Sequence, residues 1–350
     1  MRLNQAGELT LLKKLKDSFR SADSGVIIGI GDDAAVIAPQ NRQLLVTTDM
    51  MNEGVHFDLG FTSAFQLGFK LVSVNVSDIF AMGGVPKYLF LDISMKETGT
   101  TEFFDELYEG IANAMKIYGL SLLGGDLTGT MNDMALSATV IGTTEKAVLR
   151  KGASVGDKIY VTGTLGDSAC GLELLKKMRP EYKEHVRALR SDVSKKLNGQ
   201  LSFANGPSHI TLDFVSAGPL IRRHLMPLAR EASSIAGVAA SMIDISDGLF
   251  IDLSRICDES GTGARIYLDR LPLSDGLKQA CGALGLDALR FASSGGEDYE
   301  LLFTAPADAD MTGICATCIG EIIEKERIAV DASGREEELK AEGYQHFGAG

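Results

Sequence analysis

The sequence lacks the short signatures of the commonest nucleotide-binding folds. It contains no Gly-Lys dipeptide, which excludes a P-loop. No Gly-x-Gly-x-x-Gly opens a helix after a strand, so a Rossmann dinucleotide site is not expected. The pairing of His-Arg-Asp with Asp-Phe-Gly found in protein kinases is also absent. Any nucleotide that this chain binds is therefore held by a different arrangement of residues.

Cysteine is scarce, and long apolar runs are missing. Five scattered cysteines, an odd number, do not form a disulfide framework. We interpret the single Cys-x-x-Cys, Cys315 to Cys318, as two small buried residues on a strand, with a metal or redox pair as the alternative. No run approaches the roughly 18 apolar residues that cross a bilayer, and the N-terminal segment has helical spacing instead of the unbroken run of a signal peptide. We therefore expect a reducing, cytoplasmic setting and no membrane partner.

Positive charge is outnumbered by negative charge. The chain has 34 Lys and Arg against 47 Asp and Glu, which gives a net charge of -13 at pH 7. This balance argues against nucleic acid or an anionic membrane as the main partner. It also means that a polyphosphate ligand would need cations between itself and the protein.

The length and composition predict two domains. With 350 residues and 45% hydrophobic content, the chain can bury a large core. Its character changes around Arg150, so we place the boundary near residue 148, giving domains 1–148 and 149–350. Arg150 and Lys151 are the best-placed positive pair for a phosphate ligand; a charged turn between domains is the alternative.

Six short acidic motifs are the most informative feature that is present. They are Gly31-Asp32-Asp33, Thr47-Thr48-Asp49, Ser77-Asp78, Gly124-Gly125-Asp126, Asp244 to Gly248, and Gly295-Gly296-Glu297-Asp298. Most follow an apolar run, which predicts carboxylates at the ends of buried strands. Hard oxygen ligands suit Mg²⁺, which enzymes usually share with phosphates. Any one of these motifs is explained as turn chemistry, but six together predict a site.

The chain is predicted to alternate between strands and helices, which is an α/β pattern. One helix is expected over 64–82, capped by Thr62 or Ser63 and ended at Gly83, and it carries Ser77-Asp78. A second is expected over 102–118, capped by Thr101 and ended by Gly119. The polar stretch 176–216 is interpreted as an irregular surface excursion, helical in part. Predicted strands include 26–30, 44–48, 88–95, 120–123 and 134–141.

Eight motifs, in this order, resemble one family. They are GIGDDAAVI, TTDMMNEGVHF, NVSDIFAMGG, LLGGDLTGT, VTGTLGDSACGLELL, RRHLMP, IDISDGL and SGGEDYELLF. Together they are similar to thiamine-monophosphate kinase, a branch of the superfamily that includes aminoimidazole ribonucleotide synthetase and selenophosphate synthetase. The resemblance implies a two-domain α/β fold with mixed sheets, and it extends from about residue 25 to Phe347. Two departures are Leu127, where the family usually has Thr, and Phe80, where it has a small residue.

The resemblance also implies roles for particular residues. Positions that bind several Mg²⁺ ions correspond to Asp33, Thr47, Thr48, Asp49, Asp78, Asp126, Asp244 and Asp247. Positions that contact ATP correspond to Gly125, Asp126, Arg150 and Ser246. Positions that contact thiamine phosphate correspond to His56, Glu297 and Tyr344, and Asp32 is a second-layer partner. The family forms homodimers, with ATP held by the N-terminal domains.

The implied reaction is phosphorylation of thiamine monophosphate by direct in-line transfer. The acceptor is a phosphate with a second pKa of about 6, so its oxygens are already ionised and no general base is expected. Tyr344 is expected to hold the thiazolium cation through its ring. Structural alternatives are a hydrogen-bonded core histidine for His56, a tail residue for Tyr344 and a turn carboxylate for Glu297.

Two alternative functions stay open at this point. One is another ATP-dependent enzyme of the superfamily; selenophosphate synthetase is disfavoured because no Cys precedes residue 170. The other is a non-catalytic nucleotide-binding regulator.

Overall fold

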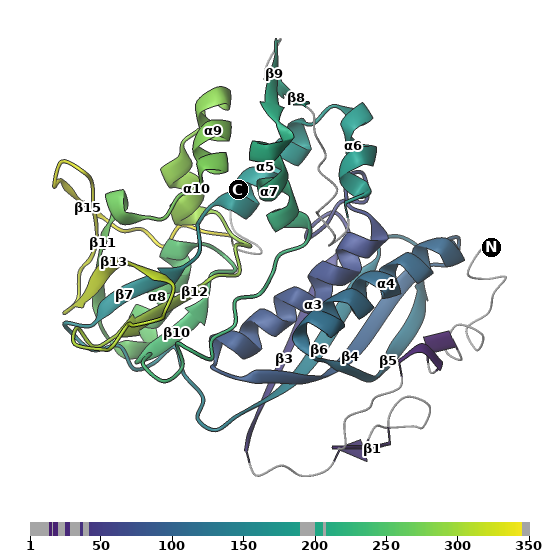
Figure 1. Ribbon diagram of the computed structural model, residues 1–350, viewed down its shortest axis with the longest axis horizontal. Helices are drawn as coiled ribbons and strands as arrows, with labels where there is room; N and C mark the ends of the chain where they lie inside the picture. Colours follow the sequence, from purple (N-terminus) through teal and green to yellow (C-terminus); the bar gives the residue numbers. More distant parts are fainter. Residues whose placement is uncertain are drawn as a thin grey trace. The chain divides into compact units, whose positions relative to one another are not determined.

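The computed structural model divides the chain into two compact units (Figure 1). It describes residues 14–15, 17–19, 25–28, 36–37, 42–189, 200–205 and 208–344. Unit 1 comprises residues 1–79, 84–146 and 186–190, and unit 2 comprises 80–83, 147–185 and 191–350. Asp32 and Asp33 lie outside the described residues, so their roles stay predictions from the sequence.

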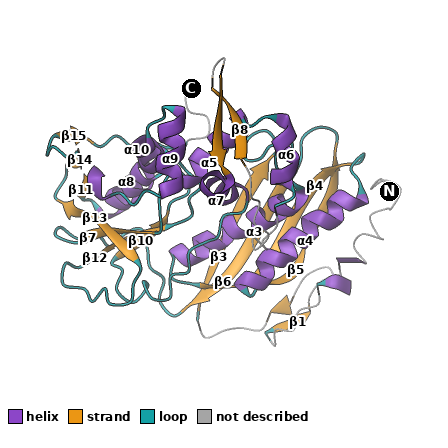
Figure 2. Cartoon of the chain, turned by 45° about the horizontal axis from the view of Figure 1, so that its top comes forward, coloured by secondary structure: helices purple, strands orange, loops and turns teal. Residues whose placement is uncertain are grey.

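Unit 1 is built on a four-stranded sheet with the order β3-β6-β4-β5. The β3–β6 and β6–β4 pairs are antiparallel, and the β4–β5 pair is parallel. Two helices, α3 (Ala64–Ala81) and α4 (Thr101–Tyr118), cover one face of this sheet (Figures 1 and 2). The strands are β3 (Gln43–Asn52), β4 (Val85–Lys96), β5 (Ser121–Thr130) and β6 (Ala135–Thr144). A short antiparallel pair, β1 (Val26–Ile28) and β2 (Val36–Ile37), precedes them.

Alternation along β4 separates the two faces of this sheet. Leu89, Leu91 and Ile93 are buried on the face that carries the helices, whereas Asp92, between them, is exposed. We call the opposite side the open face. On β3 the open face carries the exposed side chains of Leu44, Val46, Thr48 and Met50.

The helix ends follow local rules. Ser63 and Gln66 form a capping box, since the Ser63 hydroxyl accepts from the Gln66 N–H and the Gln66 side chain accepts from the Ser63 N–H. Gly119, with φ of 70°, ends α4 in the left-handed conformation, as predicted. The prediction of Thr101 as the cap of α4 is wrong by one residue, because the Thr100 hydroxyl accepts the Phe103 N–H.

Unit 2 holds a seven-stranded sheet with the order β10-β12-β7-β13-β11-β14-β15. All of its neighbouring strands are antiparallel except β11 and β14. The strands are β7 (Lys158–Thr162), β10 (Ser241–Asp244), β11 (Gly263–Tyr267), β12 (Leu301–Ala305), β13 (Ala316–Ile323), β14 (Arg327–Val330) and β15 (Glu336–Glu338). The helices are α5 (Asp167–Lys177), α6 (Pro180–Arg187), α7 (Phe214–Leu225), α8 (Leu249–Ser260), α9 (Asp275–Leu284) and α10 (Ala288–Ser294), with a 3-10 turn at Leu268–Arg270.

Two sequence expectations for unit 2 need correction. The stretch 176–216 is more regular than predicted, because it contains α6 and a hairpin of β8 (Gln200–Asn205) and β9 (Ser208–Asp213). Phe203 of this hairpin is fully buried and bridges to Met178, so the stretch adds to the core instead of only covering the surface. Cys318 lies on β13 as expected but is only partly buried, and Cys315 precedes that strand and is exposed. No helix among the described residues is long and apolar enough to span a membrane.

Candidate functional site

In unit 1, strand β3 and helix α3 bring three predicted metal-binding residues together. The Thr47 hydroxyl donates to a carboxylate oxygen of Asp78 at 2.5 Å. The backbone N–H of Asp49 donates to the side-chain oxygen of Asn75, one turn earlier on α3, at 2.9 Å. Thr47 and Asp49 are two residues apart, so their side chains point to the same side of the edge strand, and α3 supplies partners for the Thr47 hydroxyl and the Asp49 N–H.

The position of this motif within its strand differs from the prediction. Residues 47–49 lie in the middle of β3, which continues to Asn52 because it pairs with β6 along its whole length. The predicted placement at a strand end is therefore wrong for this motif. The same holds for Gly124-Gly125-Asp126, which lies inside β5.

Thr48 and Asp126 belong to the open face of the same sheet. The Thr48 hydroxyl oxygen accepts from Thr139 on β6 at 3.1 Å. Asp126 pairs in register with Asp92 on the parallel neighbour β4, so both carboxylates lie on the open face. The predicted metal-binding residues of unit 1 are therefore divided between the two faces of one thin sheet.

Gly125 has a structural reason to be glycine. Its φ is 146°, and a Cβ at this position would lie 1.8 Å from the backbone oxygen of Leu91. Strand β4 passes too closely for any side chain. Packing alone therefore accounts for glycine at this position, and the predicted contact with ATP would be a second role for the same residue.

His56 lies in the turn after β3 and is half-buried. Its Nδ1 accepts the backbone N–H of Asn52 at 3.0 Å. A neutral ring in this arrangement carries its proton on Nε2. The hydrogen bond fits the structural alternative for His56 and also fixes the ring for a role as a substrate contact.

In unit 2, the loop after β10 is organised by one buried carboxylate. Asp244 ends the strand, and Ser246 and Asp247 follow it, as predicted. An Asp252 oxygen accepts the backbone N–H groups of Ser246, Asp247 and Gly248 at 3.2, 3.1 and 3.1 Å. These hydrogen bonds tie the loop to the first turn of α8.

Arg255 joins Asp252 to the predicted metal-binding Asp247. It donates to Asp252 at 2.5 Å and to Asp247 at 2.6 Å. Burial raises the pKa of Asp252 to about 6, even though the Arg255 charge acts in the opposite direction. Neither Asp252 nor Arg255 belongs to a recognisable site motif, so the pair was not predictable from the sequence.

The segment Gly295 to Glu300 lies against this loop in a strained conformation. Glu297 and Tyr299 have positive φ angles of 65° and 51°, and such angles cost of order 1–3 kcal/mol each for residues other than glycine. The Glu297 N–H donates to the Ser246 carbonyl at 2.7 Å, and the Tyr299 N–H donates to the Ile245 carbonyl at 2.9 Å. Two of the predicted motifs, one assigned to metal and ATP and one to substrate, are therefore hydrogen-bonded to each other.

Asp298, between the two strained residues, is completely enclosed. Its carboxylate accepts the backbone N–H groups of Gly166 and Ser168 at the start of α5, at 2.5 and 3.1 Å. Burial raises its pKa to about 7, although the Arg223 charge and the two backbone hydrogen bonds act in the opposite direction. A carboxylate at a helix N-terminus is favourably placed against the helix dipole.

Buried Glu300 forms ion pairs with two arginines, Arg223 and the half-exposed Arg230, which were not predicted as site residues from the sequence. Arg230 donates through two nitrogens to both oxygens of Glu300, each at 2.8 Å, and Arg223 donates at 2.5 Å. The Thr162 hydroxyl adds a fourth bond at 2.6 Å. Burial alone would raise the pKa of Glu300, but the Arg230 hydrogen bond and the two arginine charges outweigh it and lower that pKa.

The three predicted residues of the substrate and phosphate region in unit 2 have different surroundings. The Glu297 carboxylate lies 3.0 Å from Nδ1 of buried His224 on α7. The Tyr344 N–H donates to the Asp247 carbonyl at 2.9 Å, and its side chain is about half exposed. Arg150 is exposed, and its carbonyl accepts from Ser260 at 3.4 Å. Glu297 and Tyr344 are thus both attached to the loop 245–247.

The donor set is chemically suited to Mg²⁺, because it consists of carboxylate and hydroxyl oxygens. Within the ranges that the structure describes, no three Asp, Glu, His or Cys side chains are grouped closely enough to enclose a metal by themselves. Unit 1 carries Thr47, Thr48, Asp49, Asp78 and Asp126, and unit 2 carries Asp244 and Asp247. A metal held by either set alone would therefore need oxygens from a ligand to complete its shell.

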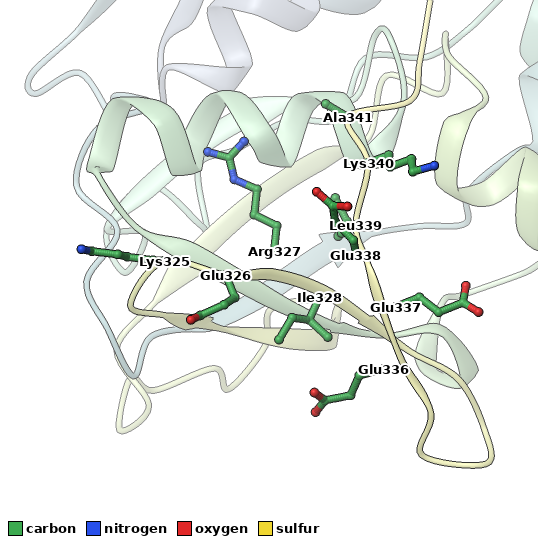
Figure 3. A pocket seen from close by; sticks show the side chains of 10 residues that line it. All are labelled: Lys325, Glu326, Arg327, Ile328, Glu336, Glu337, Glu338, Leu339, Lys340 and Ala341. Atoms are coloured by element: carbon green, nitrogen blue, oxygen red, sulfur yellow. The ribbon is translucent and has the colours of Figure 1, made fainter.

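A shallow hollow of about 850 Å³ lies elsewhere in unit 2, along β14 and β15 (Figure 3). It is lined by charged side chains of both signs, and it contains no predicted site residue. The three consecutive glutamates of β15 occupy the edge of the sheet, where charge prevents pairing with another strand. The charged residues that line the hollow are therefore accounted for by this sheet edge, and we assign them no part in the predicted site.

Comparison with known proteins gives a consistent result over almost the whole chain. Residues 31–144 match the family model of AIR synthase related protein, N-terminal domain, and residues 204–333 match that of the C-terminal domain. A thiamine-monophosphate kinase of Aquifex aeolicus is 34% identical over 349 residues, covering 99% of this chain and 100% of the relative. That of Escherichia coli K12 is 34% identical, covering 97% and 98%.

Solved structures agree with the sequence comparison. The structure of AaThiL complexed with AMPPCP and TMP is 32% identical, with a TM-score of 0.73 and 99% of each chain covered. The expected α/β fold with mixed sheets and two AIR synthase related domains is confirmed.

Proposed function

Because the chain belongs to the thiamine-monophosphate kinases of the AIR synthase related superfamily, we propose that it transfers a phosphoryl group from ATP to thiamine monophosphate, giving thiamine diphosphate. The observation that carries this proposal is the attachment of Glu297 to the loop of Ser246 and Asp247. The Glu297 N–H donates directly to the carbonyl of Ser246, and this hydrogen bond between the residue assigned to the acceptor and a residue assigned to ATP supports the proposal. Similarity to a protein complexed with AMPPCP, an ATP analogue, and TMP supports the same pairing.

The proposed transfer is in line and needs no general base. The acceptor phosphate, with a second pKa of about 6, is largely ionised at neutral pH. The protein's task is then alignment and charge neutralisation. Bound Mg²⁺ would supply the positive charge that separates the two phosphate groups, and it would be held by Asp33, Thr47, Thr48, Asp49, Asp78, Asp126, Asp244 and Asp247.

The remaining residues would hold the two substrates. Gly125, Asp126, Arg150 and Ser246 are assigned to ATP. His56, Glu297 and Tyr344 are assigned to thiamine monophosphate, with the Tyr344 ring offering its face to the thiazolium cation. We also propose domains 1–148 and 149–350 and a cytoplasmic location.

We further propose that the chain forms a homodimer through the open face of the unit 1 sheet. Leu44, Val46 and Met50 on that face are 60%, 65% and 57% exposed, and contiguous exposed apolar side chains mark interaction surfaces. Val46→Glu should reduce the mass measured by light scattering to that of a monomer. Val215→Glu, on the exposed side of α7, is the matched control, and a monomeric native chain would refute the proposal.

The activity is tested with a panel of acceptors: thiamine, thiamine monophosphate and aminoimidazole precursors, each with ATP and Mg²⁺. ADP formation with thiamine monophosphate alone is the expected result. ADP formation with another acceptor, and none with thiamine monophosphate, would identify a different enzyme of the superfamily.

A non-catalytic regulator is distinguished by two variants. Asp49→Ala and Asp126→Ala should abolish transfer in an enzyme while the protein stays folded, with Asp133→Ala as an exposed control. If the chain were a regulator, the native protein would bind ATP without turnover.

A further inference from the structure

The strained segment around Asp298 is held by one arginine from a different element. We propose that Arg223, on the last turn of α7, is a positioning residue for Glu297 in the recognition of thiamine monophosphate. This inference rests on the proposed function. It concerns a residue that touches the backbone of the segment and would not contact the substrate itself.

The contact of Arg223 is made at the centre of the strained segment. Its Nε and one terminal nitrogen donate to the Asp298 carbonyl at 3.2 and 2.9 Å. The residues on either side, Glu297 and Tyr299, are the two non-glycine residues with positive φ among those that the structure describes. A backbone in this conformation persists only when its surroundings over-determine it, and the forked guanidinium group fixes this peptide from one side.

Arg223 is itself held firmly. Its guanidinium group donates to Glu300 at 2.5 Å and lies 3.7 Å from the Asp298 carboxylate. Glu300 is in turn held by Arg230 and Thr162. The side chain of Arg223 is only 20% exposed. Arg223 therefore reaches the peptide from a fixed position.

The next residue of α7 contacts the side chain that the segment presents. Nδ1 of His224 lies 3.0 Å from the Glu297 carboxylate and 3.3 Å from the Ser168 hydroxyl. The end of α7 thus supports Glu297 twice, with Arg223 on the following carbonyl and His224 on the carboxylate. If the peptide relaxed toward an ordinary φ, the Glu297 carboxylate would leave this position.

A lysine cannot replace Arg223 in this arrangement. Lysine carries the charge that Glu300 needs, but it cannot donate to the Asp298 carbonyl and to Glu300 through a planar fork. Arg223→Lys therefore keeps the ion pair with Glu300 while weakening the hydrogen bonds to the Asp298 carbonyl, so it tests the second contact separately from the first. The adjacent Arg222 offers a control of the same type on the same helix turn.

The experiment measures KM and kcat for both substrates in Arg223→Lys, Arg223→Gln and Arg222→Gln. Displacement of a positioned group by about 1 Å costs up to roughly 100-fold. We expect KM for thiamine monophosphate to rise about 10-fold or more in Arg223→Gln and by less in Arg223→Lys. KM for ATP should change less than that for thiamine monophosphate, and Arg222→Gln should behave as the native chain.

A double variant identifies the route of the effect. If Arg223 acts through Glu297, then Arg223→Lys in a Glu297→Gln background should add little to the KM of Glu297→Gln alone. If Arg223→Gln fails to fold because Glu300 loses part of its charge balance, Arg223→Gln combined with Glu300→Gln repeats the test without that charge.

Three outcomes overturn the inference. An unchanged KM for thiamine monophosphate in folded Arg223 variants overturns this inference but leaves the proposed function standing. Full additivity with Glu297→Gln has the same consequence. Absence of thiamine monophosphate turnover by the native chain overturns the proposed function, and this inference falls with it.

Discussion

The Thr47 hydroxyl donates a 2.5 Å hydrogen bond to the Asp78 carboxylate and so connects edge strand β3 to helix α3. Both residues belong to the proposed metal-binding set. The bond also fixes the direction of the Asp78 carboxylate, so Thr47 would orient a second proposed ligand in addition to supplying its own oxygen.

Thr47→Val should therefore weaken metal use more than it weakens the fold. Loss of one hydrogen bond costs about 0.5–1.5 kcal/mol of unfolding free energy, whereas loss of an orienting partner typically costs 10–100-fold in metal affinity. The measurement is the Mg²⁺ concentration needed for half-maximal transfer. Thr130→Val on β5 of the same sheet is the control, and an equal Mg²⁺ requirement in both variants would contradict the prediction.

Asp252→Ala should be strongly destabilising. The change removes the acceptor of three backbone N–H groups and leaves Arg255 without its buried partner. Breaking a buried pair on one side costs about 3–5 kcal/mol. Asp258→Ala, which removes the largely exposed carboxylate of an ion pair with Arg327, should cost about 0–1 kcal/mol. Urea denaturation compares the two, and similar midpoints would show that Asp252 does not organise the loop.

Gly296→Ala should disturb the hydrogen-bonded contact between the segment Gly295 to Glu300 and the loop that contains Ser246. A Cβ at this position would lie 2.6 Å from the Ser246 carbonyl oxygen, so the backbone must move, at a cost of about 1–3 kcal/mol. Because Ser246 is assigned to ATP and Glu297 to the acceptor, KM should rise for both. Gly282→Ala, inside α9 with open space around it, should stabilise the protein by up to about 1 kcal/mol, as judged by thermal unfolding.

Asp298→Asn should change how stability depends on pH. Burial raises the pKa of Asp298 in the folded state to about 7, well above its ordinary value of 3.8, so the folded state binds this proton more tightly than the unfolded chain does. The stabilisation from that proton is complete below pH 4 and is lost as the pH rises through 7. Arg223 and Asp167 are the charged groups that act on it.

Relative to Asp298→Asn, the native protein should therefore lose about 2–3 kcal/mol of unfolding free energy between pH 5 and pH 7. Chemical denaturation at several pH values measures the difference between the two proteins. A difference that stays constant over this range would show that Asp298 does not take up a proton on folding.

The features that the sequence predicted well depend on local rules. The capping box of Ser63 and the left-handed Gly119 are determined by a few neighbouring residues. The loop after β10 was also predictable, since a short apolar strand leads directly into Asp244. In these cases the physical cause and the sequence signal occupy the same stretch of chain.

The features that it missed depend on residues far apart in the chain. The length of β3 is set by β6, whose partner for Asp49 is Ala138, so the end of the apolar run LLV did not mark the end of the strand. The partners of Asp298 and Glu300 come from α5, α7 and Arg230. Nothing in the local sequence states that RRHLMP and SGGEDYE meet, although both motifs were visible.

Strand β7 has a consequence for how the protein is made. Strand β7 ends at Thr162, whereas its two neighbours, β12 and β13, lie between Leu301 and Ile323. A ribosome adding about 5–20 residues per second needs roughly 10–30 s to supply the intervening chain. Through that interval both edges of an apolar strand wait unpaired, and unpaired edges invite aggregation. The order of strands in this sheet therefore leaves the partly made chain with an unpaired apolar strand for much of its synthesis.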